Sequence, residues 1–447
     1  MPRPPAGADP DQTRSDVAHL LRRSGFGATA ETVDQLAALG YEGAVERVCD
    51  LSTADAAADA VPPPAFDTAG YLAGVQGDAD ERRAAQRQAR VEREALVVWW
   101  VRRMVAAARP LAEKLTFLWH DHFATSLASV KVAELMFRQQ QTLHGLGTGR
   151  FDTLVGAVAR DPAMLIWLDG RESTLRSPNE NFGREMLELF TLGHGSDHHG
   201  PPYTEDDVRE LARSLTGWVI DRSTGRSILH PARHDGGTKS VLGERGPFGL
   251  DDVVAIATEQ PECAPHVVAR LWSRLARPAS PEDPVVQALA TDFARDLDIA
   301  ALLRRIFLHP QFRTPETKQG LVRMPIDFVV GTLRTLSVDL PTASLLGVLR
   351  GLAQIPFVPP DVAGWPANEA WISTSSAQVR LQFSLAVAER AASGGLVDAT
   401  AQDRPRLLSR RLGLDGWSDA TAASLEAATG PTMALALALC SPEYVVA

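Results

Sequence analysis

The sequence predicts a mainly α-helical protein, a large helical domain with a minor β-hairpin near residues 217–245. Two observations lead to this fold class. Most segments place apolar side chains three and four residues apart, and many of them begin at a residue that caps a helix. Only after residue 217 do apolar residues follow an extended pattern, in two short stretches on either side of a turn at 221–226.

Composition limits the class of protein. The chain has 447 residues, 45% of them hydrophobic and 22% charged, which is typical of a soluble globular protein with a sizeable core. The formal net charge of −10 argues against a nucleic-acid partner. The three cysteines lie far apart in the sequence, which argues against a disulfide framework or a thiolate metal site.

Several other classes have no support in the sequence. No stretch reaches the roughly 18 apolar residues of a membrane span, and no N-terminal leader is visible, so we expect a cytoplasmic protein. Gly-x-Gly-x-x-Gly, P-loop and Gly-x-Ser-x-Gly motifs are absent from the sequence. The common kinds of nucleotide-dependent chemistry and of serine hydrolysis are therefore not indicated.

The elements of the first half follow from local signals. Residues 1–12 are expected to be disordered, and residues 13–447 to form a single integrated helical domain. Within that domain, the segment 52–80 is rich in Ala, Asp and Pro and is expected to be a loop. A long amphipathic helix is expected over 80–109, and Pro110 begins the next helix at a favourable first-turn position.

Further along the chain, Thr204 and Asp207 form a capping box that opens a helix. The remainder from residue 251 is expected to be mostly helical, apart from a Pro- and Trp-rich loop at 357–375. That loop is long for a compact domain, and loops of this length often carry function.

A charged helix at 179–193 is the first candidate site. Asn179 is a good N-cap and Gly193 a natural stop, and between them Asn181, Glu185 and Glu188 form a row on one face.

Two interpretations of this charged face remain open. It can be a solvated face on which Arg184 bridges the acidic residues four positions away, Glu180 and Glu188. Alternatively, Glu185 and Glu188 can be a coupled pair for acid–base chemistry or for a cation, oriented by Arg184 and Asn181.

His120 and His122 are the candidate metal ligands. On a strand or loop, alternate residues lie on one side and can share a divalent ion such as Zn, Mn or Fe. On a continuing helix the two imidazoles would lie about 200° apart and could not share an ion. The alternative is metal-free, with each imidazole satisfied by a hydrogen bond inside the core.

Two further groups are candidates. His234 and Asp235, with Lys239 beyond two glycines, could orient a base or bind an anionic group, or could form a turn with solvated charges. Trp365 and Trp371 could form a stacking surface or a lid for a sugar, or could anchor their loop to the core. A third set of histidines, in glycine-rich surroundings, is expected to form a flexible polar loop: His194, His198 and His199.

With these segments identified, the chain resembles a bacterial family known only as domain of unknown function 1800. The resemblance covers nearly the whole chain and rests on the following segments: His19-Leu20-Leu21-Arg22-Arg23 with Gly25-Phe26-Gly27, Trp99-Trp100, Glu113-Lys114-Leu115-Thr116, Trp119-His120-Asp121-His122-Phe123-Ala124-Thr125-Ser126, Ala159-Arg160-Asp161-Pro162, Pro178-Asn179-Glu180-Asn181-Phe182 with Arg184-Glu185, Leu215-Thr216-Gly217-Trp218, His234-Asp235 with Lys239, Gly364-Trp365-Pro366, Trp371-Ile372 with Thr374, and Ser441-Pro442-Glu443-Tyr444.

The resemblance implies no established reaction, but it does imply that these segments belong to one recurrent arrangement. Many members of the family look exported, whereas no leader is visible here, and Ser373 stands where such proteins often have Asn.

Two function hypotheses follow from these sites. The first is an enzyme, a hydrolase or transferase acting on a polar substrate such as a glycan, with paired carboxylates, histidines and one divalent metal at the site. The second is a non-enzymatic binding or scaffold protein whose charged helix is structural. Burial distinguishes them, because an enzyme would gather the carboxylates and histidines in a concave site.

Overall fold

The computed structural model describes residues 9–195, 200–221, 224–391, 396 and 398–446. Helices dominate it, and the strands of the described residues form two short antiparallel hairpins, which confirms the predicted fold class. In the first hairpin Trp218 pairs with Leu229, and in the second Lys239 pairs with Gly246. The predicted hairpin region therefore holds two separate two-stranded sheets.

The elements of the first third of the chain are α1 (Pro10–Ser24), α2 (Ala30–Ala37), α3 (Gly40–Cys49), α4 (Ala56–Asp59), α5 (Thr68–Gly74), α6 (Ala79–Ala106), α7 (Leu111–His122), α8 (Leu127–Val130) and α9 (Ala133–Leu146). The middle of the chain forms α10 (Phe151–Ala159), α11 (Pro162–Trp167), η1 (Gly170–Glu172), α12 (Glu180–Glu185), the π-helix η2 (Met186–Thr191), α13 (Glu205–Ser214), β1 (Trp218–Ile220), β2 (Ser227–Leu229), η3 (Pro231–Arg233), β3 (Lys239–Val241) and β4 (Glu244–Gly246).

The last part of the chain forms α14 (Leu250–Thr258), α15 (Cys263–Leu275), α16 (Pro284–Asp296), α17 (Ile299–Leu308), η4 (Pro310–Arg313), α18 (Pro315–Lys318), α19 (Pro325–Leu336), α20 (Thr342–Gly351), η5 (Asn368–Trp371), α21 (Thr374–Arg390), η7 (Ala401–Asp403), α22 (Arg404–Leu412), α23 (Asp419–Ala427), α24 (Pro431–Cys440) and α25 (Pro442–Val445).

The structure differs from the expected elements at two places near the N-terminus. Helix α1 begins at Pro10, because Asp9 caps it by accepting a hydrogen bond from the backbone N–H of Asp11, so the first helix starts before residue 13. The segment 52–80 contains the helices α4 and α5, each capped by an aspartate, and is therefore not the continuous loop that its composition indicated.

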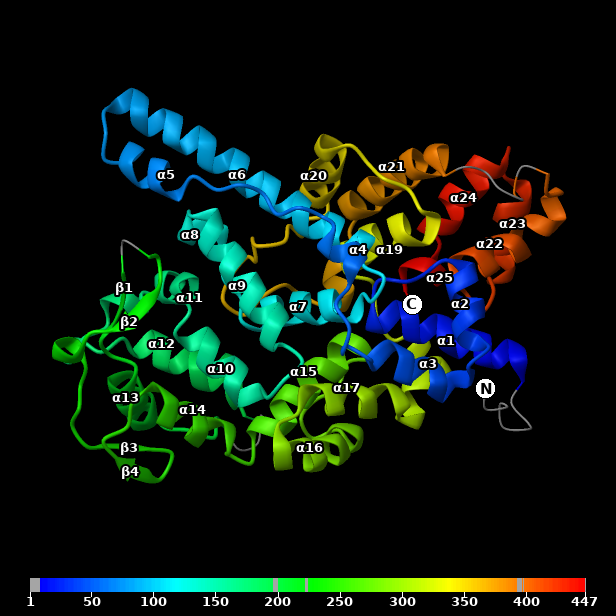
Figure 1. The fold of residues 1–447 in the computed structure, drawn as a ribbon. Coiled ribbons are helices and arrows are strands. Elements are labelled where there is room, and N and C mark those ends of the chain that lie inside the picture. The colour runs from blue at the N-terminus through cyan, green and yellow to red at the C-terminus, as the bar shows by residue number, and fades with distance from the viewer. Residues whose placement is uncertain (1–8, 196–199, 222–223, 392–395, 397, 447) are drawn as a thin grey trace.

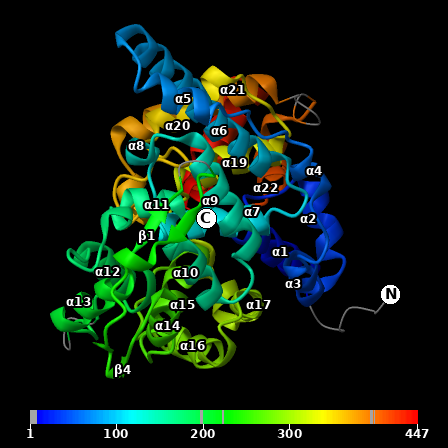
Figure 2. The ribbon, with the colours of Figure 1, turned by 60° about the vertical axis from the view of Figure 1, so that its left-hand side comes forward.

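The chain folds back on itself so that N-terminal and C-terminal helices are neighbours, α2 contacting α22. In Figure 1, the N-terminal helices α1–α3 and the C-terminal helices α22–α25 lie on the same side of the molecule. Helices α10–α14 with both hairpins lie on the opposite side, and α7, α9 and α15 lie between the two sides. Both views show the outer half of α6, with α5 against it, projecting from the rest of the molecule (Figures 1 and 2).

One connected cluster of buried apolar side chains extends from α1 to the C-terminal helix α25. Its largest fully buried members are Trp100, Trp119, Trp272 and Tyr444, which come from α6, α7, α15 and α25. Elements from every part of the sequence therefore share one core. Among the residues that the structure describes, no helix is both long enough and apolar enough to span a membrane.

The charged helix α12 packs closely against α13 at Gly183. A Cβ atom added at Gly183 would lie 2.9 Å from the carbonyl oxygen of Val208 and 3.2 Å from the Cβ of Ala212. Val208 and Ala212 form part of the buried face of α13. The close approach of the two helices requires a residue without a side chain at this position.

We therefore expect Gly183→Ala to destabilise the protein by about 1–3 kcal/mol, because the added methyl group overpacks the contact between α12 and α13. Unfolding in urea measures the effect. The matched control is Gly347→Ala in α20, where no heavy atom lies within 4 Å of the added Cβ. That change should be stabilising by up to about 1 kcal/mol, since alanine is the better helix former. Equal effects of both changes would contradict the packing argument.

Candidate functional site

The two glutamates of the charged helix lie where its geometry changes. Helix α12 ends at Glu185, and the π-helix η2 continues the same segment with wider turns. Asn179 caps α12 by accepting a hydrogen bond from the N–H of Phe182, and Gly193 has a φ of +81°, as the N-cap and stop predicted. The π-helix was not expected from the sequence. Such turns occur frequently at functional sites.

Two histidines on other elements bind the end of the π-helix. His266 of α15 donates from Nε2 to the carbonyl oxygen of Leu189 at 3.0 Å, and His122 of α7 donates from Nε2 to that of Phe190 at 3.1 Å. Burial lowers the pKa of both imidazoles, that of His266 to about 4. Both rings are therefore neutral near pH 7, and they fix the helix end on which Glu188 is carried.

Glu188 is contacted on both of its carboxylate oxygens, by a hydrogen bond on one and by an imidazole at ion-pair distance on the other. The hydroxyl of Tyr203 donates to Oε2 at 3.0 Å, and Nδ1 of His194 lies 2.9 Å from Oε1. The pKa of Tyr203 is raised, first by burial and then by its hydrogen bond to Glu188, so this hydroxyl keeps its proton. The carboxylate of Glu188 is thereby fixed in one orientation.

Glu185 lies beside Glu188, but its carboxyl group has a different environment. Its side chain is half-buried, and among the residues that the structure describes none donates a hydrogen bond to its carboxyl group. Its pKa is raised, first by burial and then by the negative charge of Glu188, while Arg184 and His194 oppose the shift. Asp361, from the Pro- and Trp-rich loop, lies close enough to raise it further.

Arg184 and Asn181 do not orient the glutamates as expected. Both terminal nitrogens of Arg184 bind the carboxylate of Glu205 in the first turn of α13, at 2.8 and 2.7 Å. Glu180 and Glu188, the predicted partners of Arg184, make no ion pair with it in the described structure. Asn181 is exposed to solvent. Arg184 thus joins α12 to α13, and it acts on Glu185 only through its charge.

His120 and His122 do not form a ligand pair. Helix α7 continues through both residues, which puts the two rings on different sides, as the helical alternative required. Nε2 of His120 accepts a hydrogen bond from the N–H of Phe357 at 3.0 Å, and burial lowers its pKa to about 3. Each imidazole therefore binds the backbone of another segment.

No metal ligand set is formed elsewhere in the described residues either. No group of three or more His, Cys, Asp or Glu side chains there is placed to hold a metal ion. The divalent metal expected from the His-x-His pattern thus has no ligand set in this part of the chain.

Asp121, between the two histidines, makes an interaction that its sequence context did not indicate. Its Oδ1 accepts a hydrogen bond from the N–H of Trp365 at 2.7 Å, and its Oδ2 pairs with Nη2 of Arg274 at 2.6 Å. A Cβ atom at Gly364, whose φ is +88°, would collide with Asp121. Phe357 also has a positive φ of 68°, which is strained for a bulky residue and persists because its N–H and carbonyl are both bound.

The tryptophans of the loop face the core. Trp365 is 3% exposed and stacks on Phe117 with 5.3 Å between ring centroids, and Trp371 is 6% exposed. Neither indole presents an open face on which a sugar could stack. These buried positions agree with the alternative interpretation, in which the two tryptophans anchor the loop to the core.

The residues around His234 bind other groups of the hairpin region. Nδ1 of His234 lies 2.9 Å from the carbonyl oxygen of Thr216, and Asp235 pairs with Arg213 at 2.7 Å. Lys239 is fully buried, and its ammonium group donates to the carbonyl oxygens of Asp235, Gly237 and Phe248. Its donors are directed at the protein's own backbone instead of a substrate. Of the predicted polar histidine loop, His194 is exposed, and His198 and His199 lie outside the described residues.

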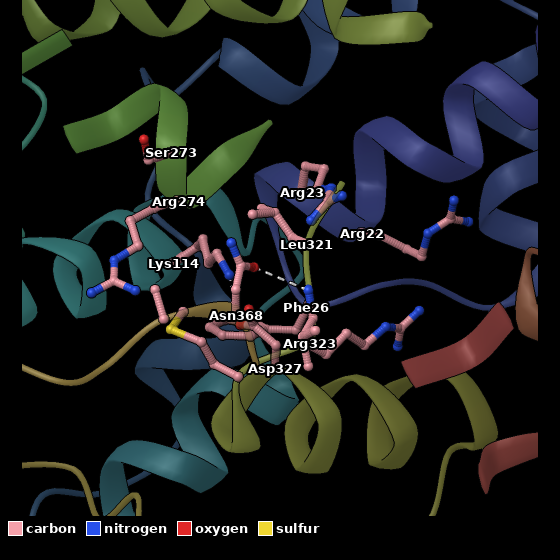
Figure 3. A pocket seen from close by; sticks show the side chains of 13 residues that line it. Arg22, Arg23, Phe26, Lys114, Ser273, Arg274, Leu321, Arg323, Asp327 and Asn368 are labelled. Carbon is pink, nitrogen blue, oxygen red and sulfur yellow. Dashed lines mark hydrogen bonds and ion pairs between the residues drawn. The ribbon is translucent and has the colours of Figure 1, made fainter. Parts of the chain in front are cut away.

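A second site was missed by sequence reasoning, and we name it the arginine pocket. It is a small hollow that opens to solvent. Its polar lining consists of five cationic residues, one carboxylate, one amide and one hydroxyl: Arg22, Arg23, Lys114, Arg274, Arg323, Asp327, Asn368 and Ser273 (Figure 3). In the sequence, this pocket is indicated only by the adjacent pair Arg22-Arg23 in α1 and by Lys114 in α7. These residues are far apart in the sequence, and the fold brings them together.

Comparisons with known proteins give one match. The model of the family described as "Protein of unknown function (DUF1800)" matches residues 19–446. No curated protein matches the chain, and no solved structure does. The matched range contains every segment on which the resemblance rests, from His19 to Tyr444.

Removing the charge of Asp121 should destabilise the protein strongly. We expect Asp121→Asn to lower the free energy of unfolding by about 3–5 kcal/mol, because it leaves the guanidinium of Arg274 buried without its anion. The matched control is Glu94→Gln, which breaks a half-exposed pair with Arg350 and should cost less than about 1 kcal/mol. Urea denaturation of both variants makes the comparison, and a small effect of Asp121→Asn would contradict the assigned role.

The raised pKa of Glu185 predicts a specific pH dependence. Folding raises this pKa above its unfolded value near 4.3, so the folded state binds more protons in that window and stability falls as the pH rises through it. Glu185→Gln removes the charge. The variant should therefore melt at a higher temperature than the unmodified protein at pH 7, and this advantage should vanish near pH 4.

Melting temperatures of both proteins between pH 4 and pH 8 test this dependence. Glu180→Gln, on the exposed side of the same helix, is the control and should give a difference that is independent of pH. A constant difference for Glu185→Gln over the whole range would show that the carboxyl group titrates normally.

Proposed function

Because the chain belongs to the DUF1800 family of proteins of unknown function, we propose its function from the site, as an enzyme that uses Glu185 and Glu188 for acid–base chemistry. The substrate class that we propose is polar, such as a glycan, and the reaction is hydrolysis or group transfer. The observation that carries the proposal is the contrast between the two neighbouring carboxyl groups.

The contrast gives each glutamate a role. Glu188 accepts a hydrogen bond from Tyr203 and lies at ion-pair distance from His194, and these contacts hold it in place next to the reacting atoms. Glu185 lacks such partners among the described residues, and its raised pKa suits a group that gives up and recovers a proton. Pairs of titratable groups in such unequal environments are the usual sign of a divided acid and base role.

The surroundings favour a polar substrate. Arg184, His194 and Asp361 lie near the two glutamates and are at least partly accessible, and the buried Tyr203 contributes its hydroxyl group. Hydroxyl-rich molecules can exchange hydrogen bonds with such groups. In glycoside cleavage one carboxylic acid protonates the leaving oxygen while a second carboxylate assists on the sugar, which is the pair of roles proposed here.

The scaffold alternative rests on a different observation. Arg184 binds Glu205 bidentately and thereby joins α12 to α13, which is a structural use of one charge on this helix. Glu185 separates the two hypotheses, because a carboxyl group with a purely structural role would be expected to accept hydrogen bonds from the protein. Trp365 and Trp371 are buried in the chain's own core, so they offer no exposed surface to a partner.

The test is turnover of a panel of oligosaccharides and alkyl glycosides. We expect Glu185→Gln to lower kcat by about 10²–10⁴-fold on substrates with poor leaving groups, because they need the proton. Turnover of nitrophenyl glycosides should be affected much less, because nitrophenolate is a leaving group that needs no protonation. Glu180→Gln should retain full activity, and circular dichroism should show that all variants are folded.

Two results would contradict this proposal. One is full activity of Glu185→Gln on alkyl glycosides, which would remove the proposed acid. The other is the absence of turnover of every member of the panel by the unmodified protein, which would reject the glycan as substrate.

A further inference from the structure

The arginine pocket lies where distant parts of the chain meet. Arg22 and Arg23 come from the last turn of α1, Lys114 from α7 and Arg274 from α15. Arg323 precedes α19, and Asp327 lies in its first turn. The pocket shares no residue with the glutamate pair, so a ligand bound in it would occupy a site separate from that of the proposed function.

Two of the five cations are neutralised by carboxylates. Nζ of Lys114 lies 2.6 Å from Oδ1 of Asp327, and Nη2 of Arg274 lies 2.6 Å from Oδ2 of Asp121. These ion pairs use the one carboxylate that lines the pocket and a second one that lies beyond it. The remaining charges have to be balanced in some other way.

The other three cations have no carboxylate partner within ion-pair distance among the described residues. Arg23 donates from Nη2 to the carbonyl oxygen of Thr317 at 3.0 Å, and Arg22 donates to that of Gly413. The guanidinium of Arg323 lies over the ring of Tyr444, 4.0 Å from its centroid. Carbonyl oxygens and an aromatic face stabilise these groups without cancelling their charge.

These three arginines also keep unused hydrogen-bond donors inside the protein. Nε of Arg22, Nε of Arg23 and Nη2 of Arg323 are buried without an acceptor in the described structure. Arg23 is 6% exposed and Arg323 is 8% exposed. Buried donors without acceptors are costly, and charged ones are the most costly.

Burial and repulsion by neighbouring arginines lower the pKa values of Arg22 and Arg23. The pKa of Arg23 is lowered to about 9, first by burial and then by the charges of Arg22 and Arg323. That of Arg22 is lowered to about 10, first by burial and then by the charge of Arg323, while Asp415 opposes the shift. Figure 3 shows Lys114 and Asn368 in the middle of the pocket, Arg23 above them, and Arg22 and Arg323 extending to one side.

We propose that the arginine pocket binds a small phosphate-type oxyanion, either inorganic phosphate or the phosphoryl group of a phosphorylated metabolite. A tetrahedral dianion offers several acceptor oxygens to the cations that line the pocket, and it cancels charge that the chain leaves unbalanced. Guanidinium groups match phosphate oxygens through paired, charge-assisted hydrogen bonds, which makes arginine the preferred residue for this task.

Asn368 provides a test that keeps the fold intact. Its Oδ1 accepts a hydrogen bond from the N–H of Val322 at 3.2 Å, and its amide lies among the cations of the pocket. Asn368→Asp keeps this acceptor and puts a permanent negative charge where the oxyanion would bind. The φ of Asn368 is +51°, a conformation that aspartate also tolerates.

The experiment measures binding of inorganic phosphate by calorimetry and by melting temperature, against sodium chloride at equal ionic strength. We expect saturable binding and stabilisation by phosphate. Asn368→Asp should melt at a higher temperature than the unmodified protein without phosphate, and should bind phosphate at least tenfold more weakly. Arg23→Gln should also lose at least tenfold in affinity.

Arg334→Gln is the matched control. Arg334 is another buried arginine, bound to the carbonyl oxygens of Met104, Val105 and Ala107 outside the pocket. Its replacement should lower the melting temperature but leave the affinity for phosphate within about twofold. Phosphate stabilisation no greater than that by chloride would overturn the proposal, and so would undiminished phosphate binding by Asn368→Asp.

A second arm distinguishes the two sources of the anion. Glycerol phosphate that binds at least tenfold more tightly than inorganic phosphate would assign the pocket to a phosphorylated metabolite. Equal or weaker binding of glycerol phosphate would assign it to the free ion. Either result supports an oxyanion site only if Asn368→Asp weakens that binding.

Discussion

The buried carboxylate of Asp121 at the end of α7 is the interaction on which the arrangement of both sites depends. It holds the backbone of Trp365 on one side and the guanidinium of Arg274 on the other. The residues beside it, His120 and His122, bind the backbone of the Pro- and Trp-rich loop and of the π-helix. Three consecutive side chains thus place three segments that are far apart in the sequence.

This arrangement positions the glutamate pair from two directions. His122 and His266 bind the carbonyl groups at the end of the π-helix, which sets the position of Glu188. The loop held by His120 and Asp121 brings Asp361 toward Glu185. His120 and His122 therefore act through the backbone groups that they bind, and the raised pKa of Glu185 is a consequence of the way the segments pack.

The same end of α7 connects the glutamate pair with the arginine pocket. Arg274 lines the arginine pocket while it neutralises Asp121, so its charge is compensated from outside the pocket. The arginines that are not compensated lie on α1 and ahead of α19. The net charge of −10 means that the chain has more acidic than basic residues. Its acidic residues nevertheless form no ion pairs with these arginines in the described structure. Uncompensated buried charge lowers stability, and binding sites are where such a cost is commonly retained.

Local interactions account for the features that could be predicted from the residues alone: the mainly helical fold class, the hairpin region, the caps at Asn179 and Thr204 and the stop at Gly193. Each depends on residues within a few positions of one another. Long-range packing, by contrast, determines that Arg184 binds Glu205, that Trp365 faces the core, that His120 and His122 bind backbone groups, and that Arg22, Arg23 and Lys114 share a pocket. Partners separated by tens or hundreds of residues leave no periodic signal, because their contact depends on how the helices pack and on which groups that packing removes from water.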